Sequence, residues 1–222
     1  MESGIPDFRS PGGLWSKYDP REFGTIESFR ANPGKVWQML VELDEVLMRA
    51  DPNPGHLALA ELERRGILKV VITQNVDSLH QRAGSIEVIE FHGNNRVLRC
   101  ESCGREFQRE SVSLRSLPPR CACKGALRPD IVFFGEPIPE EAYHRSMAAA
   151  SRCDLMLIIG TSASVAPAST LPRIAKGNGA FLLEINPEAS ELTHHLTDLH
   201  VSESAGLALS GIVAALDMHD KQ

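Results

Sequence analysis

Four cysteines of this 222-residue chain have the spacing of metal ligands. Cys100 and Cys103 form one close pair and Cys121 and Cys123 form another, with residues 104–120 between them. Two close pairs across an insert of hairpin length can supply four thiolates to a tetrahedral Zn²⁺ ion. The alternative is four buried cysteines without a metal. Since no histidine or carboxylate spacing indicates an open coordination position, we expect a structural zinc ion that stabilises a segment too small for its own core.

A second group of reactive side chains follows two expected strands. The apolar run 67–72 predicts a buried strand, and the polar stretch Thr73-Gln74-Asn75-Val76-Asp77 comes directly after it. Residues 87–91 predict a second strand, which delivers His92. In an open parallel sheet, ligands bind at the carboxyl ends of the strands, and a histidine there is suited to proton transfer. Taken singly, these residues could cap a helix or form structural hydrogen bonds. Their joint placement indicates a reaction site.

A third candidate, Gly160-Thr161-Ser162, follows the apolar run 154–159. A glycine-containing turn after a buried strand can bind phosphate through its backbone N–H groups, or it can be only a turn.

The elements that must position these residues follow from the apolar spacing. We expect helices at 25–49, 57–65, 139–151, 167–176 and 205–216, a short helix ending near residue 84, and strands at 67–72, 87–91, 131–134, 154–159, 180–185 and 199–202. The strands are continuously apolar and alternate with helices, which predicts an α/β protein whose parallel sheet is covered on both faces.

The composition sets limits on location and partners. With 42% hydrophobic and 23% charged residues, the chain resembles ordinary soluble proteins. Its longest apolar run, Leu155–Ile159, is far too short for a bilayer, and residues 1–6 lack the pattern of a signal peptide. We therefore expect a cytoplasmic protein without membrane partners. The net charge of −6 argues against direct nucleic-acid binding.

Several blocks in order along the chain match those of a known family. They are Gly4-Ile5-Pro6-Asp7-Phe8-Arg9, Thr73-Gln74-Asn75-Val76-Asp77 with Leu79-His80, Phe91-His92-Gly93, the cysteine pairs, residues 128–136, Gly160-Thr161-Ser162 with Val165 and Pro167, and Glu184-Ile185-Asn186. On these blocks the chain resembles the sirtuins, a family of NAD-dependent protein deacylases. The resemblance implies a Rossmann-like, doubly wound parallel sheet with a smaller module made of a zinc ribbon and helices. It implies an NAD-binding domain at 1–24, 54–93 and 127–222, a helical module at 25–53 and a zinc ribbon at 94–126.

The resemblance also implies a reaction and the residues that perform it. In the family, the amide oxygen of acyl-lysine attacks the nicotinamide ribose, nicotinamide leaves, a histidine acts as base on a ribose hydroxyl, and the acyl group departs on ADP-ribose. By position, His92 is that base. The implied NAD-binding residues are Asp7, Phe8, Arg9, Gln74, Asn75, Asp77, Gly160, Thr161, Ser162, Asn186 and Ala205. The implied binding residues for an acyl-lysine protein or peptide are Val132, Phe133, Phe134, Gly135, Glu136 and Val165, which would hold the peptide as an added strand.

Two departures from the family pattern are informative. Members that prefer succinyl- or malonyl-lysine carry a Tyr and an Arg where this chain has Leu40 and Leu43. We therefore expect an uncharged acyl group and a deacetylase, although simple helix packing also accounts for both leucines. The family's first strand and Gly-Ala-Gly loop precede the block that starts here at Ser3. Because that loop would cradle the pyrophosphate, we expect a shortened gene model, a late start codon or a trimmed fragment.

Two alternatives stay open beside deacylation. One is protein ADP-ribosyl transfer, and the other is a truncated chain that serves only as a peptide-binding or zinc-scaffold module. We expect a monomer.

Overall fold

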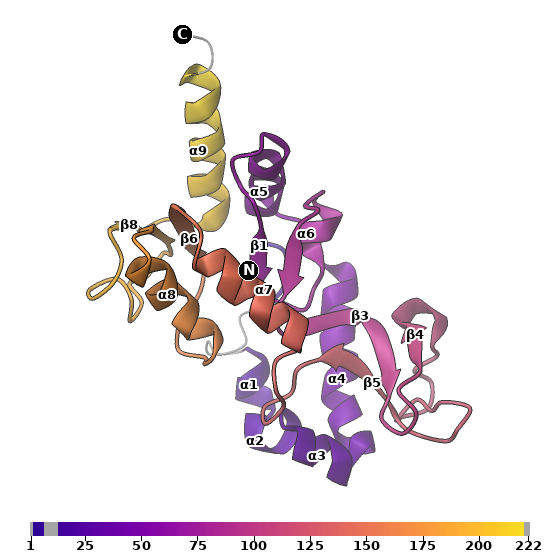
Figure 1. The fold of residues 1–222 in the computed structure, drawn as a ribbon. Coiled ribbons are helices and arrows are strands. Elements are labelled where there is room, and N and C mark those ends of the chain that lie inside the picture. Colours follow the sequence, from indigo (N-terminus) through magenta and orange to yellow (C-terminus); the bar gives the residue numbers. More distant parts are fainter. Residues whose placement is uncertain (1, 7–12, 220–222) are drawn as a thin grey trace. The chain divides into compact units, whose positions relative to one another are not determined.

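The structure is a computed structural model that describes residues 2–6 and 13–219 (Figure 1). The chain divides into two compact units. Unit 1 comprises Met1–Asp51, Asn75–Ser78 and His92–Ile138, and unit 2 comprises Pro52–Gln74, Leu79–Phe91 and Pro139–Gln222. The functional domain boundaries given above are defined by what each part would bind, and they stay a prediction.

Unit 1 contains a run of helices, of which the two within residues 25–49 were predicted as a single helix and the two before residue 25 were not predicted. The helices are α1 (Leu14–Lys17), α2 (Pro20–Phe23), α3 (Ile26–Ala31) and α4 (Pro33–Arg49). The predicted helix breaks at Asn32 because Pro33 has no N–H to continue α3, whereas proline suits the first turn of a new helix. The Asn32 side chain caps α4 by accepting a hydrogen bond from the Lys35 N–H.

The other part of unit 1 is an antiparallel sheet with the strand order β4-β3-β5. Its strands are β3 (Gly93–Cys100), β4 (Glu106–Gln108) and β5 (Leu127–Ile131), and a 3₁₀ turn, η1 (Arg109–Ser111), follows β4. Trp37 of α4 is 1% exposed and packs with the sheet residues Leu98 and Leu127. Its indole N–H donates to the Leu127 carbonyl at 2.7 Å, so the buried polar atom is satisfied. This core joins α4 to the sheet.

Unit 2 has the parallel pairing that continuous apolarity predicted. β1 (Val71–Thr73) pairs with β2 (Val88–Glu90), and β6 (Leu155–Ile159), β7 (Phe181–Ile185) and β8 (Leu199–Val201) form a three-stranded sheet. All of these pairs are parallel. Among the described residues the strands of unit 2 form these two separate ladders. β1 starts later than predicted, because its register with β2 begins at Val71, and Ile67 is 53% exposed.

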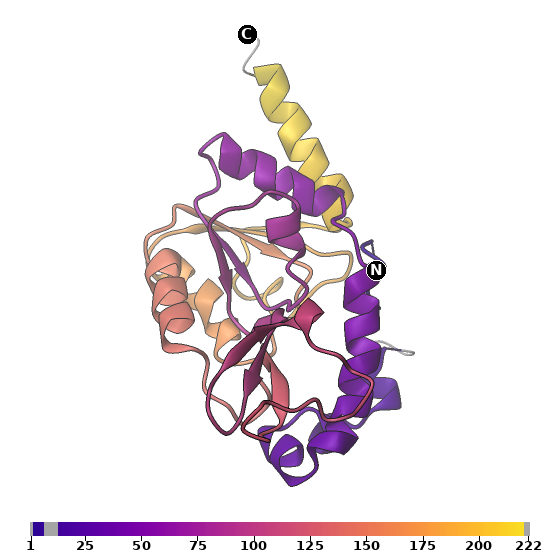
Figure 2. The ribbon, with the colours of Figure 1, turned by 90° about the vertical axis from the view of Figure 1, so that its right-hand side faces the viewer.

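Helices of unit 2 follow the strands in the predicted order. They are α5 (Pro54–Arg64), α6 (Leu79–Arg82), α7 (Glu140–Ala150), the 3₁₀ turn η2 (Ala168–Thr170), α8 (Leu171–Gly177) and α9 (Ala205–His219). Figures 1 and 2 show α9 beside α5, where Leu59 and Leu209 share a core with Ile185 of β7. None of the described helices is long and apolar enough to cross a membrane.

His80 of α6 is a buried polar residue in unit 2. It is 9% exposed, its ring centroid lies 4.7 Å from that of His56, and its Nδ1 has no hydrogen-bond partner among the described residues. Burial, followed by repulsion from His56, lowers the pKa of His80 to about 4. The folded chain therefore holds this imidazole neutral where an unfolded chain would bind a proton.

This pKa predicts a loss of stability in mild acid. Between pH 6.5 and 4 the unfolded state binds the proton and the folded state does not, so the free energy of unfolding falls as the pH falls. We expect His80 to account for a decrease of about 2 kcal/mol between pH 6.5 and 5. Urea unfolding at both pH values measures it. His80→Asn should remove this part of the slope, whereas the exposed His144→Gln should retain it. Equal slopes in wild type and His80→Asn would contradict the assignment.

Candidate active site and metal site

The four predicted metal ligands lie together in unit 1. The Sγ atoms of Cys100, Cys103, Cys121 and Cys123 are all within 4.8 Å of one another. The distance is 3.5 Å from Cys100 Sγ to Cys123 Sγ and 3.7 Å from Cys103 Sγ to Cys121 Sγ. A compact group of four thiols from two turns is the donor set of a structural zinc ion. This group is able to hold one.

Two tight turns bring the cysteines together. Gly104 N–H donates to the Cys100 carbonyl at 2.9 Å, and Lys124 N–H donates to the Cys121 carbonyl at 2.8 Å. Lys124 has φ +70, because the second pair has one intervening residue and the chain must turn sharply after it. A Cβ on Gly125 would lie 2.7 Å from Cys100 Sγ, so glycine is required there.

The thiols resist joint ionisation without a cation. Burial disfavours the Cys100 thiolate, but the Cys103 and Ser102 N–H groups lower its pKa to about 7. At Cys123 the Gly125 N–H favours the thiolate, yet hydrogen bonds with the other three thiols raise its pKa to about 12. A divalent cation reverses this balance because it binds thiolates.

His92 lies at the start of β3 in unit 1. The His92 carbonyl accepts from the Val132 N–H at 2.9 Å, which fixes its backbone beside the segment after β5. The next residue, Gly93, has φ +73, and a Cβ there would lie 1.9 Å from the Asp130 carbonyl oxygen. Only glycine permits this approach. The backbone of His92, whose side chain is half-buried, is therefore held at a fixed point beside the sheet.

The loop Asn75–Ser78 belongs to the same unit. The Asn95 N–H of β3 donates to the Val76 carbonyl at 3.0 Å, so the loop is bonded to the strand that begins next to His92. Asn75 is exposed, and Asp77 is half-buried. Unit 1 thus brings two predicted NAD-binding residues and the predicted base onto neighbouring segments.

The predicted substrate segment, Val132–Glu136, also lies in unit 1. Arg128 is the residue that shapes it: its Nη1 and Nη2 donate to the two carboxylate oxygens of Glu136, each at 2.6 Å, and its guanidinium lies 4.7 Å from the Phe133 ring centroid. Burial alone would raise the pKa of Glu136, but Arg128 and the Phe133 N–H keep it below its usual value. Phe134 is bonded through its N–H and carbonyl to Gly24 and Ile26. Val165 belongs to unit 2.

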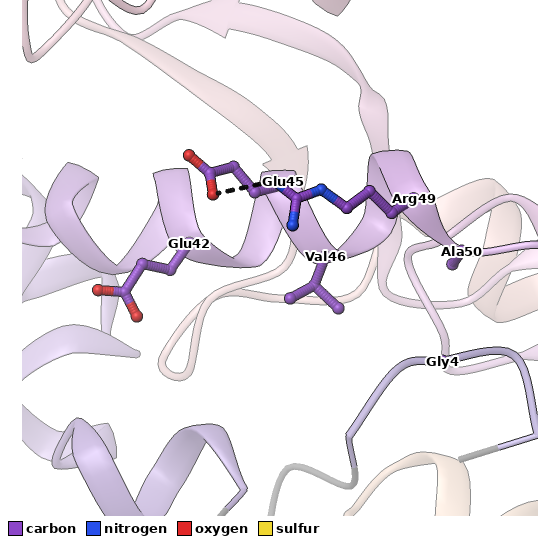
Figure 3. A pocket seen from close by; sticks show the side chains of 6 residues that line it. All are labelled: Gly4, Glu42, Glu45, Val46, Arg49 and Ala50. Carbon is purple, nitrogen blue, oxygen red and sulfur yellow. Dashed lines mark ion pairs between the residues drawn. The ribbon is translucent and has the colours of Figure 1, made fainter.

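Unit 1 also contains an open hollow of about 520 Å³ on the outer side of α4 (Figure 3). It is lined by Gly4, Glu42, Glu45, Val46, Arg49 and Ala50. Glu45 and Arg49 form an ion pair at 3.8 Å, and Lys17 and Tyr18 both donate to Glu42. Its lining residues include Gly4 of the first matching block, but neither His92 nor Asn75.

In unit 2, three predicted NAD-binding residues meet at strand ends. Gln74 follows β1, Thr161 follows β6 and Asn186 follows β7. Gln74 Nε2 lies 3.5 Å from Thr161 Oγ1, and Asn186 Nδ2 donates to the Thr161 carbonyl at 3.2 Å. Polar groups at the carboxyl ends of parallel strands are typical of nucleotide binding.

The remaining predicted residues of unit 2 are less closely connected. Gly160 has φ +58 and forms the turn after β6, and Ser162 lies 2.9 Å from Ser164 through their hydroxyl oxygens. Ala205 begins α9 and packs against the start of α5 at Gly55. Asp7, Phe8 and Arg9 lie outside the described residues.

Two polar residues near Asn186 were not among the predicted site residues, although Glu184 lies in one of the matched blocks. His200 of β8 lies with its Nε2 2.8 Å from the Asn186 carbonyl oxygen, and Glu184 is fully buried two residues before Asn186. Burial alone would raise the pKa of Glu184, but hydroxyl donors, led by Ser190 and Thr193, keep it below its usual value. In the sequence, Glu184 is the one carboxylate within the apolar run 180–185, and this pattern could have indicated a buried polar residue near the site.

The metal site predicts the effect of one exposed cysteine. Cys103→Ser removes one thiolate without opening a cavity, so we expect zinc content well below one per chain and a loss of stability on the order of several kcal/mol. Elemental analysis and urea unfolding of reduced protein measure both. Cys153→Ser is the matched control, because Cys153 lies outside the cluster and should leave zinc in place. Folded, reduced wild type without zinc would contradict the site.

Comparison with known proteins identifies the family. A model described as "Sir2 family" matches residues 1–167. "NAD-dependent protein deacylase 2" of Pyrobaculum aerophilum is 47% identical over 213 residues, which cover 96% of this chain and 85% of that protein. A solved Sir2 homolog–NAD complex has a TM-score of 0.92 at 43% identity, covering 98% of this chain and 85% of that one. A solved complex of Sir2 with a p53 peptide and NAD⁺ has a TM-score of 0.88 at 34% identity, covering 97% and 88%. The predicted Rossmann-like α/β fold with a zinc module is confirmed, and the chain belongs to the Sir2 family, the sirtuins.

Proposed function

We propose that this chain is an NAD-dependent protein-lysine deacylase, and that acetyl is its preferred acyl group. The observation that carries the proposal is the fixed position of His92, bonded to the segment after β5 and next to the strand that holds the Asn75–Ser78 loop. A relative with 47% identity is named an NAD-dependent protein deacylase, and a structural neighbour with 43% identity binds NAD.

The residues of both units have the chemistry that NAD requires. We assign the phosphate and adenosine side to Thr161 and Asn186 of unit 2, which lie at strand ends, and we place Gln74, which contacts Thr161, beside the residues of the nicotinamide side. We assign the nicotinamide side to Asn75 and Asp77. When bound, NAD supplies the ribose carbon that the acyl-lysine oxygen attacks, the leaving nicotinamide and the ADP-ribose that carries the acyl group away.

His92 acts as the base in this scheme. Its imidazole accepts the proton of a ribose hydroxyl, which makes that oxygen able to attack the acyl carbon. The close approach of Gly93 to Asp130 and the bond from Val132 hold the His92 backbone in place. The zinc ion is structural, because four cysteines leave it no open position.

The acyl-lysine peptide binds as an added strand beside Val132–Glu136. The Arg128–Glu136 pair holds this segment in shape, and a structural neighbour binds a p53 peptide. Val165 of unit 2 keeps the role that the family resemblance implies, and so do Asp7, Phe8 and Arg9, which lie outside the described residues. A monomeric state, a cytoplasmic location and the absence of nucleic-acid binding stay predictions.

One assay tests the activity and the base together. Incubation with NAD and an acetylated peptide should release nicotinamide and O-acetyl-ADP-ribose, both measured by mass spectrometry. His92→Ala should lower turnover by about 10²- to 10⁴-fold and leave NAD binding nearly unchanged, because the base acts after binding. The exposed His144→Gln should match wild type.

The products decide between the alternatives. ADP-ribosylated protein without peptide deacylation would favour the ADP-ribosyltransferase alternative. Full turnover in His92→Ala would remove His92 from its assigned role.

The acyl group follows from two buried leucines of α4. Leu40 is 2% exposed and Leu43 is 7% exposed, and both are apolar, so neither offers a cation or a hydrogen-bond donor to an acidic acyl chain. We expect kcat/KM for an acetylated peptide to exceed that for the succinylated peptide by about tenfold or more, since a desolvated carboxylate would lack a partner. Matched peptides of one sequence with acetyl, butyryl and succinyl groups measure this. Equal rates for acetyl and succinyl would show that these leucines do not set the preference.

A further inference from the structure

Asp44 is a buried carboxylate on the apolar side of α4. It is 5% exposed and lies between Leu43 and Leu47, which are also buried. A charge in such a place is retained only where partners compensate for the water it has lost. The role of Asp44 can therefore be inferred from the groups that pair with its carboxylate.

The carboxylate has two partners from different parts of unit 1. Arg109 donates from Nε to Asp44 Oδ1 at 2.8 Å and from Nη2 to Oδ2 at 2.5 Å, which is a two-pronged ion pair. Asn95 donates from Nδ2 to the same Oδ1 at 2.8 Å. The Asp44 side chain is 7% exposed and that of Arg109 is 15% exposed, so solvent screens the pair little.

Arg109 connects this carboxylate to the zinc ribbon. It directly follows β4, which pairs with β3 from Arg99 to Val97, and β3 ends at the metal-ligating Cys100. A further Arg109 nitrogen, Nη1, donates to the Val112 carbonyl at 3.1 Å. The guanidinium is thus fixed on the ribbon side as well as on the α4 side.

Asn95 connects the carboxylate to the loop Asn75–Ser78. While its side chain donates to Asp44, its backbone N–H donates to the Val76 carbonyl at 3.0 Å. Val76 lies between Asn75 and Asp77, the residues assigned to the nicotinamide side. One residue therefore carries the constraint from α4 to the proposed cofactor loop.

We infer that Asp44 is a positioning residue for the reaction: through Asn95 it holds the loop between Asn75 and Asp77 in place, and through Arg109 it anchors that contact to the zinc ribbon. The inference rests on the proposed function. The contacts of Asp44 thus join α4, the loop Asn75–Ser78 and the zinc ribbon at one junction.

Two variants separate positioning from mere stabilisation. Asp44→Asn removes the charge with little change of shape, and Asn95→Ala removes the side-chain bond to Asp44 but leaves the Asp44–Arg109 pair and the backbone bond from Asn95 to Val76 in place. Glu22→Gln is the matched control, because it breaks an exposed ion pair, to Lys35 at 2.7 Å, in the same unit. Zinc content and circular dichroism establish that each variant is folded and loaded with metal.

We expect kcat to fall about tenfold to a hundredfold in Asp44→Asn and Asn95→Ala, because loss of the loop geometry misplaces the reacting groups. KM for the peptide should change much less, and zinc content should match wild type. Hydrogen exchange of the Asn95 amide, which is bonded to Val76, should become faster in both variants and stay at the wild-type rate in Glu22→Gln. A purely structural role would lower the unfolding midpoint and leave kcat of the folded enzyme unchanged.

The outcomes distinguish this inference from the proposed function. An active wild type with unchanged kcat in both variants would overturn the positioning role and leave the deacylase assignment standing. A wild type that released no nicotinamide would contradict the proposed function. Hydrogen exchange would then test only whether Asp44 holds the loop in place through Asn95. An unchanged exchange rate of the Asn95 amide in Asp44→Asn would overturn that contact's role, and a faster rate would support it.

Discussion

The close contact between Gly93 and the Asp130 carbonyl is the constraint on which unit 1 depends. It sets the point at which β3 begins, and thereby the position of His92 before it and of the β5 partner beside it. At its other end β3 carries Cys100, so the same strand runs from the proposed base to the metal site. A strand fixed at both ends is a rigid support, which a reaction that transfers protons over short distances requires.

Polar groups inside this unit are paired, and the pairs connect parts distant in sequence. The Trp37 indole N–H donates a hydrogen bond to the Leu127 carbonyl, and Arg128 forms a bidentate ion pair with Glu136. In each case, leaving one buried partner unpaired would cost more free energy of folding than the pair itself contributes. These contacts therefore specify one arrangement of helix, sheet and segment. The position of the substrate segment therefore follows from the burial of charge as well as from apolar packing.

The sequence predicted what local patterns encode. Continuous apolarity in 154–159 and 180–185 predicted the parallel pairing, and the spacing of Cys100, Cys103, Cys121 and Cys123 predicted the metal cluster. It did not predict the break at Asn32, where a proline overrides the apolar period, nor the late start of β1, which its pairing with β2 determines. The contact between His200 and Asn186 could not be predicted from the sequence, because only the tertiary fold brings the two residues together.

Substrate choice follows from which atoms each part can contact. A peptide added as a strand is recognised mainly through its backbone, so the segment 132–136 by itself gives modest selectivity among protein sequences. Beside the leucines of α4, the carboxylate of an acidic acyl chain would lose its water without gaining a partner. The free-energy cost of that desolvation is far larger than the binding free energy that one extra methylene group contributes. Selection by this protein should therefore depend more on the acyl group than on the residues around the lysine. Leu40 and Leu43 are buried in unit 1, and the proposed acyl preference rests on their apolar side chains.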